Sequence, residues 1–104
     1  MSHKAIQIDE EDNIATVTSD TQDNEEVEVL SPEGKVIIKT KSLDSIPFGH
    51  KIALQNLKKG DKVVKYGEVI GVASKDIRIG EWIHINNLES STVPASNLGK
   101  GEAA

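Results

Sequence analysis

The chain contains no cysteine, and this absence excludes several kinds of chemistry at once. Without thiolates there is no disulfide framework, no cysteine nucleophile and no cysteine-ligated zinc or iron–sulfur cluster. A membrane-spanning helix needs about 20 consecutive apolar residues, and the chain has no such run. The first residues also lack the apolar stretch of a signal peptide. We therefore expect a cytoplasmic protein without a membrane partner.

Aromatic residues are scarce as well, with one Trp, one Tyr and one Phe in 104 residues. Nucleic-acid-binding domains combine a concentrated basic face with aromatic side chains. Here the basic residues form one small cluster, Lys58, Lys59, Lys62 and Lys65. The composition therefore argues against a nucleic-acid partner.

Charge is distributed unevenly along the chain, whose net charge is −5. Residues 1–45 contain 11 acidic and 4 basic residues, a net of −7, whereas residues 46–104 contain 6 acidic and 8 basic, a net of +2. A mildly positive second half suits a small anionic ligand, and a solvated lysine face explains it equally well.

At 104 residues, the chain has the size of one domain. A domain this small buries only about two-thirds of the surface that its unfolded form exposes. A deep catalytic cleft is therefore hard to build, and the size favours an interface site or a partner chain.

Short stretches with alternating or β-branched apolar residues predict strands rather than helices. They cover residues 5–8, 14–18, 27–30, 35–39, 63–66 and 69–73. Ser31-Pro32-Glu33-Gly34 and Gly67-Glu68 predict hairpin turns between neighbouring strands. Residues 50–57 suit a strand better than a short helix. Residues 91–104 have little to bury and predict a flexible C-terminal tail, which leaves residues 1–90 as the domain.

One pattern, apolar-x-x-Gly-x-x-apolar, occurs three times in the second half of the chain. The copies are Ile46–Ile52, Leu57–Val63 and Ile77–Ile83. Glycine readily adopts the positive φ of a tight turn, and the flanking apolar residues can anchor that turn to a core. The chain should therefore reverse direction at each copy.

Several motifs follow one another at fixed separations, and they read Ile46-Pro47-Phe48-Gly49-His50-Lys51-Ile52-Ala53-Leu54, Gly60-Asp61, Val64-Lys65-Tyr66-Gly67, Ile70-Gly71 and Ile77-x-x-Gly80-Glu81-Trp82-Ile83-His84. Together they resemble the SAF domain of the altronate/galactarate dehydratase family, which includes the small subunit of sulfolactate sulfo-lyase. The resemblance is dense over residues 44–90 and loose over the N-terminal strands. It implies a mostly β domain, a β-clip of short twisted strands and hairpins with little helix.

The resemblance also implies an activity. Members of that family eliminate a β-substituent, water or sulfite, from a 2-hydroxy acid, often with divalent iron or manganese. The SAF domain is either the start of a longer dehydratase or a separate small subunit, and the length of this chain favours the subunit. We therefore expect an accessory subunit of a hydroxy-acid lyase, whose large partner holds most metal ligands. A non-catalytic module that binds a ligand or a protein remains the alternative, and self-association in isolation is left open.

The run His84-Ile85-Asn86-Asn87 departs from the family pattern, which usually reads His-x-His-Asn. An imidazole binds metals and moves protons near neutral pH, whereas the carboxamide of Asn86 does neither well. The run is predicted to lie in a strand, so His84 and Asn86 should share one face, and Ile83 and Ile85 should pack on the other.

The resemblance identifies His84 and His50 as the residues for proton handling or metal support. Lys65, Asn87 and Asn86 are the expected contacts with an anionic substrate, while no metal ligand can be named. A solvent-facing edge with incidental polar residues, or local turn hydrogen bonds, would explain the same residues without function.

The remaining aromatic residues and the first histidine are expected to have structural or no roles. Tyr66 is expected in the core, and Phe48 and Trp82 in core or interface packing. His3 is expected to belong to an unstructured start.

Overall fold

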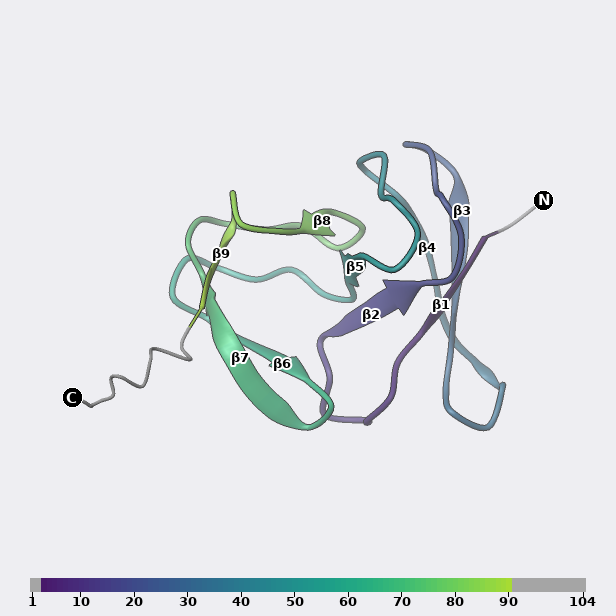
Figure 1. Ribbon diagram of the computed structural model, residues 1–104, viewed down its shortest axis with the longest axis horizontal. Helices are drawn as coiled ribbons and strands as arrows, with labels where there is room; N and C mark the ends of the chain where they lie inside the picture. Colours follow the sequence, from purple (N-terminus) through teal and green to yellow (C-terminus); the bar gives the residue numbers. More distant parts are fainter. Residues whose placement is uncertain (1–2, 91–104) are drawn as a thin grey trace.

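The computed structural model describes residues 3–90, and these residues form strands and turns without a helix. A six-stranded sheet has the order β4-β3-β1-β2-β5-β8, and a three-stranded sheet has the order β6-β7-β9 (Figure 1). The strands are β1 (His3–Ile6), β2 (Ile14–Val17), β3 (Glu26–Leu30), β4 (Val36–Lys41), β5 (Lys51–Ala53), β6 (Lys62–Lys65), β7 (Glu68–Ala73), β8 (Trp82–Ile83) and β9 (Leu88–Ser90). The prediction of a mostly β domain is confirmed. The predicted tail, residues 91–104, lies outside the described residues.

Both predicted hairpins are present. Strands β3 and β4 pair on either side of the turn that contains Gly34, whose φ is 86°. Strands β6 and β7 are joined through Tyr66 and Gly67, with φ values of 56° and 74°. Two successive positive φ values are typical of a type I′ turn, whose twist matches that of the strands. This turn lies one residue earlier than the sequence predicted.

The three glycine corners have the same local geometry. Gly49, Gly60 and Gly80 have φ values of 85°, 94° and 94°. In each corner, the residue after glycine donates a backbone hydrogen bond of 2.8–3.0 Å to the carbonyl three residues earlier, which belongs to Pro47, Lys58 or Arg78. The predicted reversals are therefore confirmed, and each leads directly into a strand, β5, β6 or β8.

Each corner is also fixed by an Asp or Asn that lies three residues beyond the end of another strand. The side-chain oxygens of Asp20, Asn56 and Asp76 each accept a hydrogen bond of 2.8–2.9 Å from a corner backbone N–H, that of Phe48, Ile79 or Lys59 respectively. These three acceptors follow β2, β5 and β7. Through them, the corner before β5 is held by the end of β2, and the corner before β8 by the end of β5.

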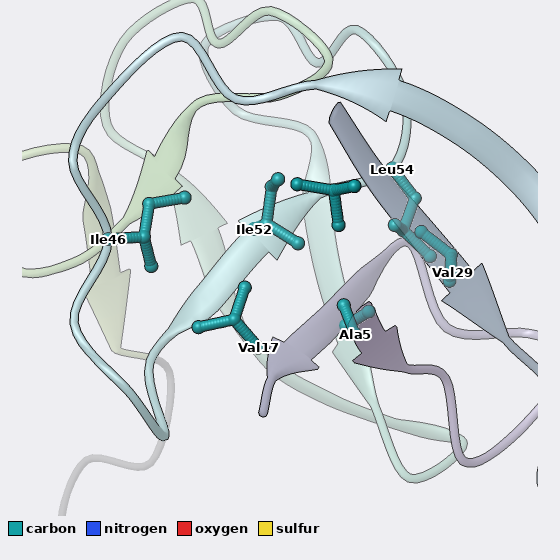
Figure 2. Packing of buried hydrophobic residues seen from close by; sticks show 8 residues of the cluster. Ala5, Val17, Val29, Ile46, Ile52 and Leu54 are labelled. Atoms are coloured by element: carbon teal, nitrogen blue, oxygen red, sulfur yellow. The ribbon is translucent and has the colours of Figure 1, made fainter. Parts of the chain in front are cut away.

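The central strands of the large sheet bury both faces. Ala15 and Ile52 belong to one core cluster, shown in Figure 2, while their chain neighbours Ile14 and Ala53 belong to a second. Successive residues of a strand point to opposite faces, so the two clusters lie on the two sides of β2 and β5. The second cluster also contains Val63 and Ala73, from β6 and β7. The small sheet therefore packs against one face of the large one.

Candidate functional site

The edge formed by β5 and β8 brings two predicted site residues together. The strands are antiparallel, with Lys51 opposite Ile83 and Ile52 opposite Trp82. His50 directly precedes β5, and His84 directly follows β8. In an antiparallel pair, the start of one strand lies beside the end of the other. The register therefore places both histidines at the same end of this strand pair.

The indole of Trp82 lies against both imidazoles. Its ring is stacked on His84, with centroids 4.1 Å apart and planes 18° apart. His50 meets the same indole edge-on, at 5.4 Å and 76°. Trp82 itself packs against the first core cluster, and its indole nitrogen is buried without a hydrogen-bond partner among the described residues. The core thus supports the ring on which both imidazoles rest.

An open hollow of about 410 Å³ lies at this edge. Its lining consists of His50, Lys51, Trp82, Ile83, His84 and Ile85. Small-molecule sites are commonly concave, mostly apolar and furnished with a few polar groups. This hollow has that composition.

The strand does not continue past Ile83, so the predicted alternation over residues 83–86 is wrong. His84–Asn87 form a turn, in which the backbone N–H of Asn87 donates to the carbonyl of His84 at 3.0 Å. Ile83 is buried as expected, but Ile85 is 91% exposed. His84 therefore owes its orientation to the turn and to Trp82 rather than to a regular strand.

The reason for the turn is the side chain of Asn87, which is 2% exposed. Its Oδ1 accepts a hydrogen bond from the backbone N–H of His84 at 2.9 Å, and its Nδ2 donates to the carbonyl of Trp82 at 2.7 Å. The sequence singled out Asn87 as a substrate contact. That role stays a prediction, and the observed contacts make Asn87 a positioning residue for His84.

The two other predicted substrate contacts lie outside the lining of the hollow. Asn86 is exposed in the same turn. Lys65 ends β6, and its Nζ lies 4.8 Å from the ring centre of Tyr66. Tyr66 is 58% exposed and Phe48 is 67% exposed, so neither is a core residue, and the core prediction for Tyr66 is wrong. The substrate roles of Asn86 and Lys65 stay predictions.

Lys51 is a residue of the hollow that sequence reasoning missed. Burial lowers the pKa of its ammonium group, and the positive charge of Lys65 lowers that pKa further. A lysine with a lowered pKa in a hollow is a candidate functional residue. The available signal was its place in Gly49-His50-Lys51, directly after a corner and at the start of a strand.

The described residues do not by themselves form a metal centre. Within residues 3–90, no three His, Asp or Glu side chains converge to hold an ion. His50 and His84 supply two nitrogen ligands at most. This part of the chain likewise contains no helix long and apolar enough to cross a membrane.

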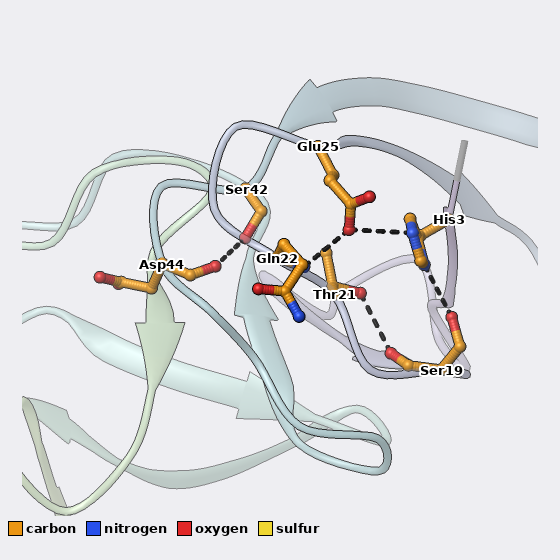
Figure 3. Close-up of polar contacts among 7 residues, drawn as sticks. All are labelled: His3, Ser19, Thr21, Gln22, Glu25, Ser42 and Asp44. Carbon is orange, nitrogen blue, oxygen red and sulfur yellow. Dashed lines mark hydrogen bonds and ion pairs between the residues drawn. The ribbon is translucent and has the colours of Figure 1, made fainter. Parts of the chain in front are cut away.

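His3 is not in an unstructured start but in β1, where it forms a second polar cluster (Figure 3). Its Nδ1 lies 2.9 Å from the hydroxyl of Ser19, and its Nε2 lies 2.9 Å from the carboxylate of Glu25. That same carboxylate accepts a backbone hydrogen bond from Gln22 at 2.7 Å. The cluster links β1 to the loop between β2 and β3.

The described residues thus form a small all-β domain, and a few polar groups line the open hollow at one edge of its large sheet. Residues 3–91 match the family of the altronate/galactarate dehydratase SAF domain, so the chain belongs to this family. It is 43% identical to the altronate dehydratase of Bacillus subtilis over 86 residues, which are 83% of this chain and 16% of that protein.

A second kind of relative is much shorter. The chain is 47% identical over 45 residues to subunit alpha of the (2R)-sulfolactate sulfo-lyase of Paracoccus pantotrophus, covering 43% of this chain and 67% of that subunit. Among the long relatives, the galactarate dehydratase (L-threo-forming) of Escherichia coli is 33% identical to this chain over 78 residues, which are 14% of that protein's length. The chain thus spans about a sixth of the dehydratases and about two-thirds of the lyase subunit.

Proposed function

We propose that the chain is a small accessory subunit of a hydroxy-acid lyase and that it acts with a large catalytic chain in the cytoplasm. Membership of the family supports a lyase activity, and the similarity to a separate lyase subunit supports a complex in which a second, larger chain carries most of the catalytic groups. The long dehydratases carry the same domain within one chain. The substrate would be a 2-hydroxy acid with a leaving group on the β carbon.

The observation that carries this proposal is the pair of imidazoles held against Trp82 at an open edge. The hydrogen bonds that His50 and His84 form with the described residues all involve their backbone atoms. Within this part of the chain, the ring nitrogens of both histidines therefore have no hydrogen-bond partner. Free ring nitrogens in a hollow can exchange a proton with a bound substrate. Imidazole is the side chain that ordinarily does so near neutral pH.

The elimination needs a base and an acid. A base removes the proton from the carbon that bears the hydroxyl group. The leaving group departs from the neighbouring carbon with the bonding electron pair, either as sulfite or as hydroxide, which takes a proton from the acid and becomes water. The resulting enol takes up a proton on carbon and becomes a 2-oxo acid. In the proposed complex, one imidazole of this chain accepts or returns a proton, and groups of the partner complete the site.

Any divalent iron or manganese would be held mainly by the partner, because the described residues of this chain lack a full ligand set. What this chain provides is a proton-exchanging surface with a fixed orientation, which Asn87 and Trp82 maintain.

A non-catalytic binding module is the second candidate. Asn86 favours it, since it stands where the family usually has a second histidine, and a carboxamide does not relay a proton well. The exposed Ile85 beside it would then serve protein docking rather than catalysis.

Co-purification with a large chain of the same family from the native host tests the proposal. The complex should release a 2-oxo acid from one member of a panel of hydroxy acids that includes sulfolactate, whereas the chain alone should not. Robust turnover by the isolated chain would contradict the two-subunit proposal. A stable complex that is inactive on the whole panel would favour the binding module.

A further inference from the structure

A fourth corner, which the glycine pattern does not reveal, lies between β2 and β3. Thr21 begins it and forms an isolated antiparallel bridge with Ile46, which begins the corner before β5. Asn24 takes the place of the glycine, with a φ of 67°. The backbone N–H of Glu25 donates to the carbonyl of Gln22 at 3.3 Å, as the equivalent residues of the other corners do. Within residues 3–90, four corners of one design thus lead into β3, β5, β6 and β8.

In three of these corners, the residue after the positive-φ position also closes the turn with its side chain. The carboxylates of Glu25, Asp61 and Glu81 each accept a hydrogen bond of 2.5–2.8 Å from the backbone N–H of the residue three positions earlier. Figure 3 shows this contact for Glu25. Hydrogen bonds to a charged acceptor are stronger than those between neutral groups. The capping carboxylate is therefore part of what holds these corners together.

The corner before β5 departs from this design at two positions at once. The residue after its glycine is His50, and the residue three positions earlier is Pro47. Proline has no backbone N–H. No side chain at position 50 can therefore form the cap that closes the other corners. The missing donor and the changed acceptor are two halves of one difference, and this corner lacks a stabilising contact that its three counterparts have.

The imidazole of His50 is consequently free of the corner. It is exposed at the hollow and meets the indole of Trp82 edge-on at 5.4 Å. In histidine, Nδ1 occupies the place along the side chain that Oδ occupies in aspartate, and in the corner before β6 that oxygen meets the N–H of Lys58 at 2.8 Å. A backbone N–H at position 47 would therefore compete for Nδ1 of His50. Local rules that the rest of a chain obeys are typically broken at functional sites.

We propose that Pro47 is a positioning residue for His50: it withholds the N–H that closes the other corners and so leaves the imidazole available at the hollow. Pro47 does not line the hollow, so it acts through His50 rather than on a bound molecule. The use of the free imidazole in proton transfer rests on the proposed function. The freedom of the ring from the corner does not, and it can be measured in the chain alone.

Pro47→Ala supplies the missing donor, and NMR of the full chain measures its effect on the ring. The nuclear Overhauser effects between the ring protons of His50 and the indole protons of Trp82 should weaken at least twofold, and the resonance of Nδ1 should shift. Pro32→Ala is the matched control, because Pro32 is exposed in the turn between β3 and β4 and its loss should change neither signal. Unchanged ring signals in Pro47→Ala would overturn the proposal, because a proline that only stiffens the corner does not act on the ring of His50.

A cycle of thermal unfolding midpoints tests the same donor by a second route, which also decides the matter if Pro47→Ala does not fold. Pro47→Lys combined with His50→Asp reproduces the pair Lys58 and Asp61 of the corner before β6. The change in midpoint of the double variant should exceed the sum of the two single changes by at least about 3 °C, as expected for one capping contact in a domain of this size. His50→Asp alone should not raise the midpoint, because Pro47 has no N–H to donate. Additive midpoints would overturn the proposal.

In an active complex, Pro47→Ala should lower kcat at least 10-fold and change KM less than threefold, because an imidazole bonded to the corner exchanges protons less readily while other substrate contacts remain. Pro32→Ala should leave both constants within twofold. If the ring of His50 responds to Pro47→Ala in the chain alone but no complex has lyase activity, the role of Pro47 stands and the proposed function fails. If a complex is active but its kcat is insensitive to Pro47→Ala, the proposed function stands and the role of Pro47 is overturned.

Discussion

The imidazole of His84 is stacked on the indole of Trp82, with ring centroids 4.1 Å apart and planes 18° apart. The stacking is the contact by which the core of the domain orients a side chain at its open edge. Trp82 packs on the first cluster, and Asn87 holds the backbone of both aromatic residues. His84 is therefore pre-oriented before a substrate or a partner arrives, which is what a proton-transfer group requires.

Replacement of Asn87 by alanine should destabilise the domain, because it leaves the backbone N–H of His84 and the carbonyl of Trp82 without their partners. An unsatisfied buried group costs about 1–3 kcal/mol, and for these half-buried groups we expect the lower part of that range. Urea denaturation gives the free energy of unfolding directly. Asn86→Ala is the matched control: Asn86 is exposed in the same turn, and its loss should change stability by less than about 0.5 kcal/mol. Equal effects of the two substitutions would contradict the role given to Asn87.

Alanine at Gly80 should destabilise the domain more than alanine at Gly60, although both glycines have a φ of 94°. At either position, the side chain costs about 1–2 kcal/mol because of the left-handed backbone. At Gly80, a Cβ would also lie 2.2 Å from the carbonyl oxygen of Lys41, whereas at Gly60 nothing lies within 4 Å. Thermal unfolding of the two variants measures the difference. Equal midpoints would show that the corner at Gly80 can relax.

Glu25 should make the stability of the domain depend on pH in the acid range. The backbone N–H of Gln22 holds the pKa of this carboxyl below its usual value, burial opposes that effect, and His3 adds to it. A carboxyl with a lowered pKa contributes stability above its unfolded pKa of about 4.5 and loses the contribution as pH falls through the folded value. Glu25→Gln should therefore lower the unfolding midpoint at pH 7 but have little effect at pH 3. Glu33→Gln, in the exposed hairpin turn, is the control, and a Glu25→Gln effect that persists at pH 3 would contradict the explanation.

Much of the fold could be predicted from the sequence because its signals are local. The alternating residues of β1, β2 and β3 and the glycine corners depend on neighbouring side chains and on backbone sterics. The Asp and Asn residues that fix the corners were missed, although each lies three residues beyond a strand. Their partners are 17 to 28 residues away, and sequence spacing alone does not show such contacts.

The site was predictable in part. The histidines at positions 50 and 84 were named from the family motif, and the antiparallel register explains why they meet. The extension of the strand through Asn86 was wrong because the buried carboxamide of Asn87 competes with the β ladder, as Asn side chains often do. Lys51 was missed because the burial that lowers the pKa of its ammonium group, and the charge of Lys65 that lowers this pKa further, both depend on how distant strands pack together.

The most direct test of the account compares His84→Ala with Ile83→Ala in the reconstituted complex. His84→Ala removes a stacking contact and should cost only about 0.5–1.5 kcal/mol of stability. The rate of the complex should nevertheless fall by about 10²- to 10⁴-fold, the range for loss of a general acid–base group. Ile83→Ala, in the core, should cost about 2–5 kcal/mol and lower activity only through loss of folded protein. If His84→Ala keeps the wild-type rate per folded complex, His84 is a structural histidine, and the proposed site is wrong.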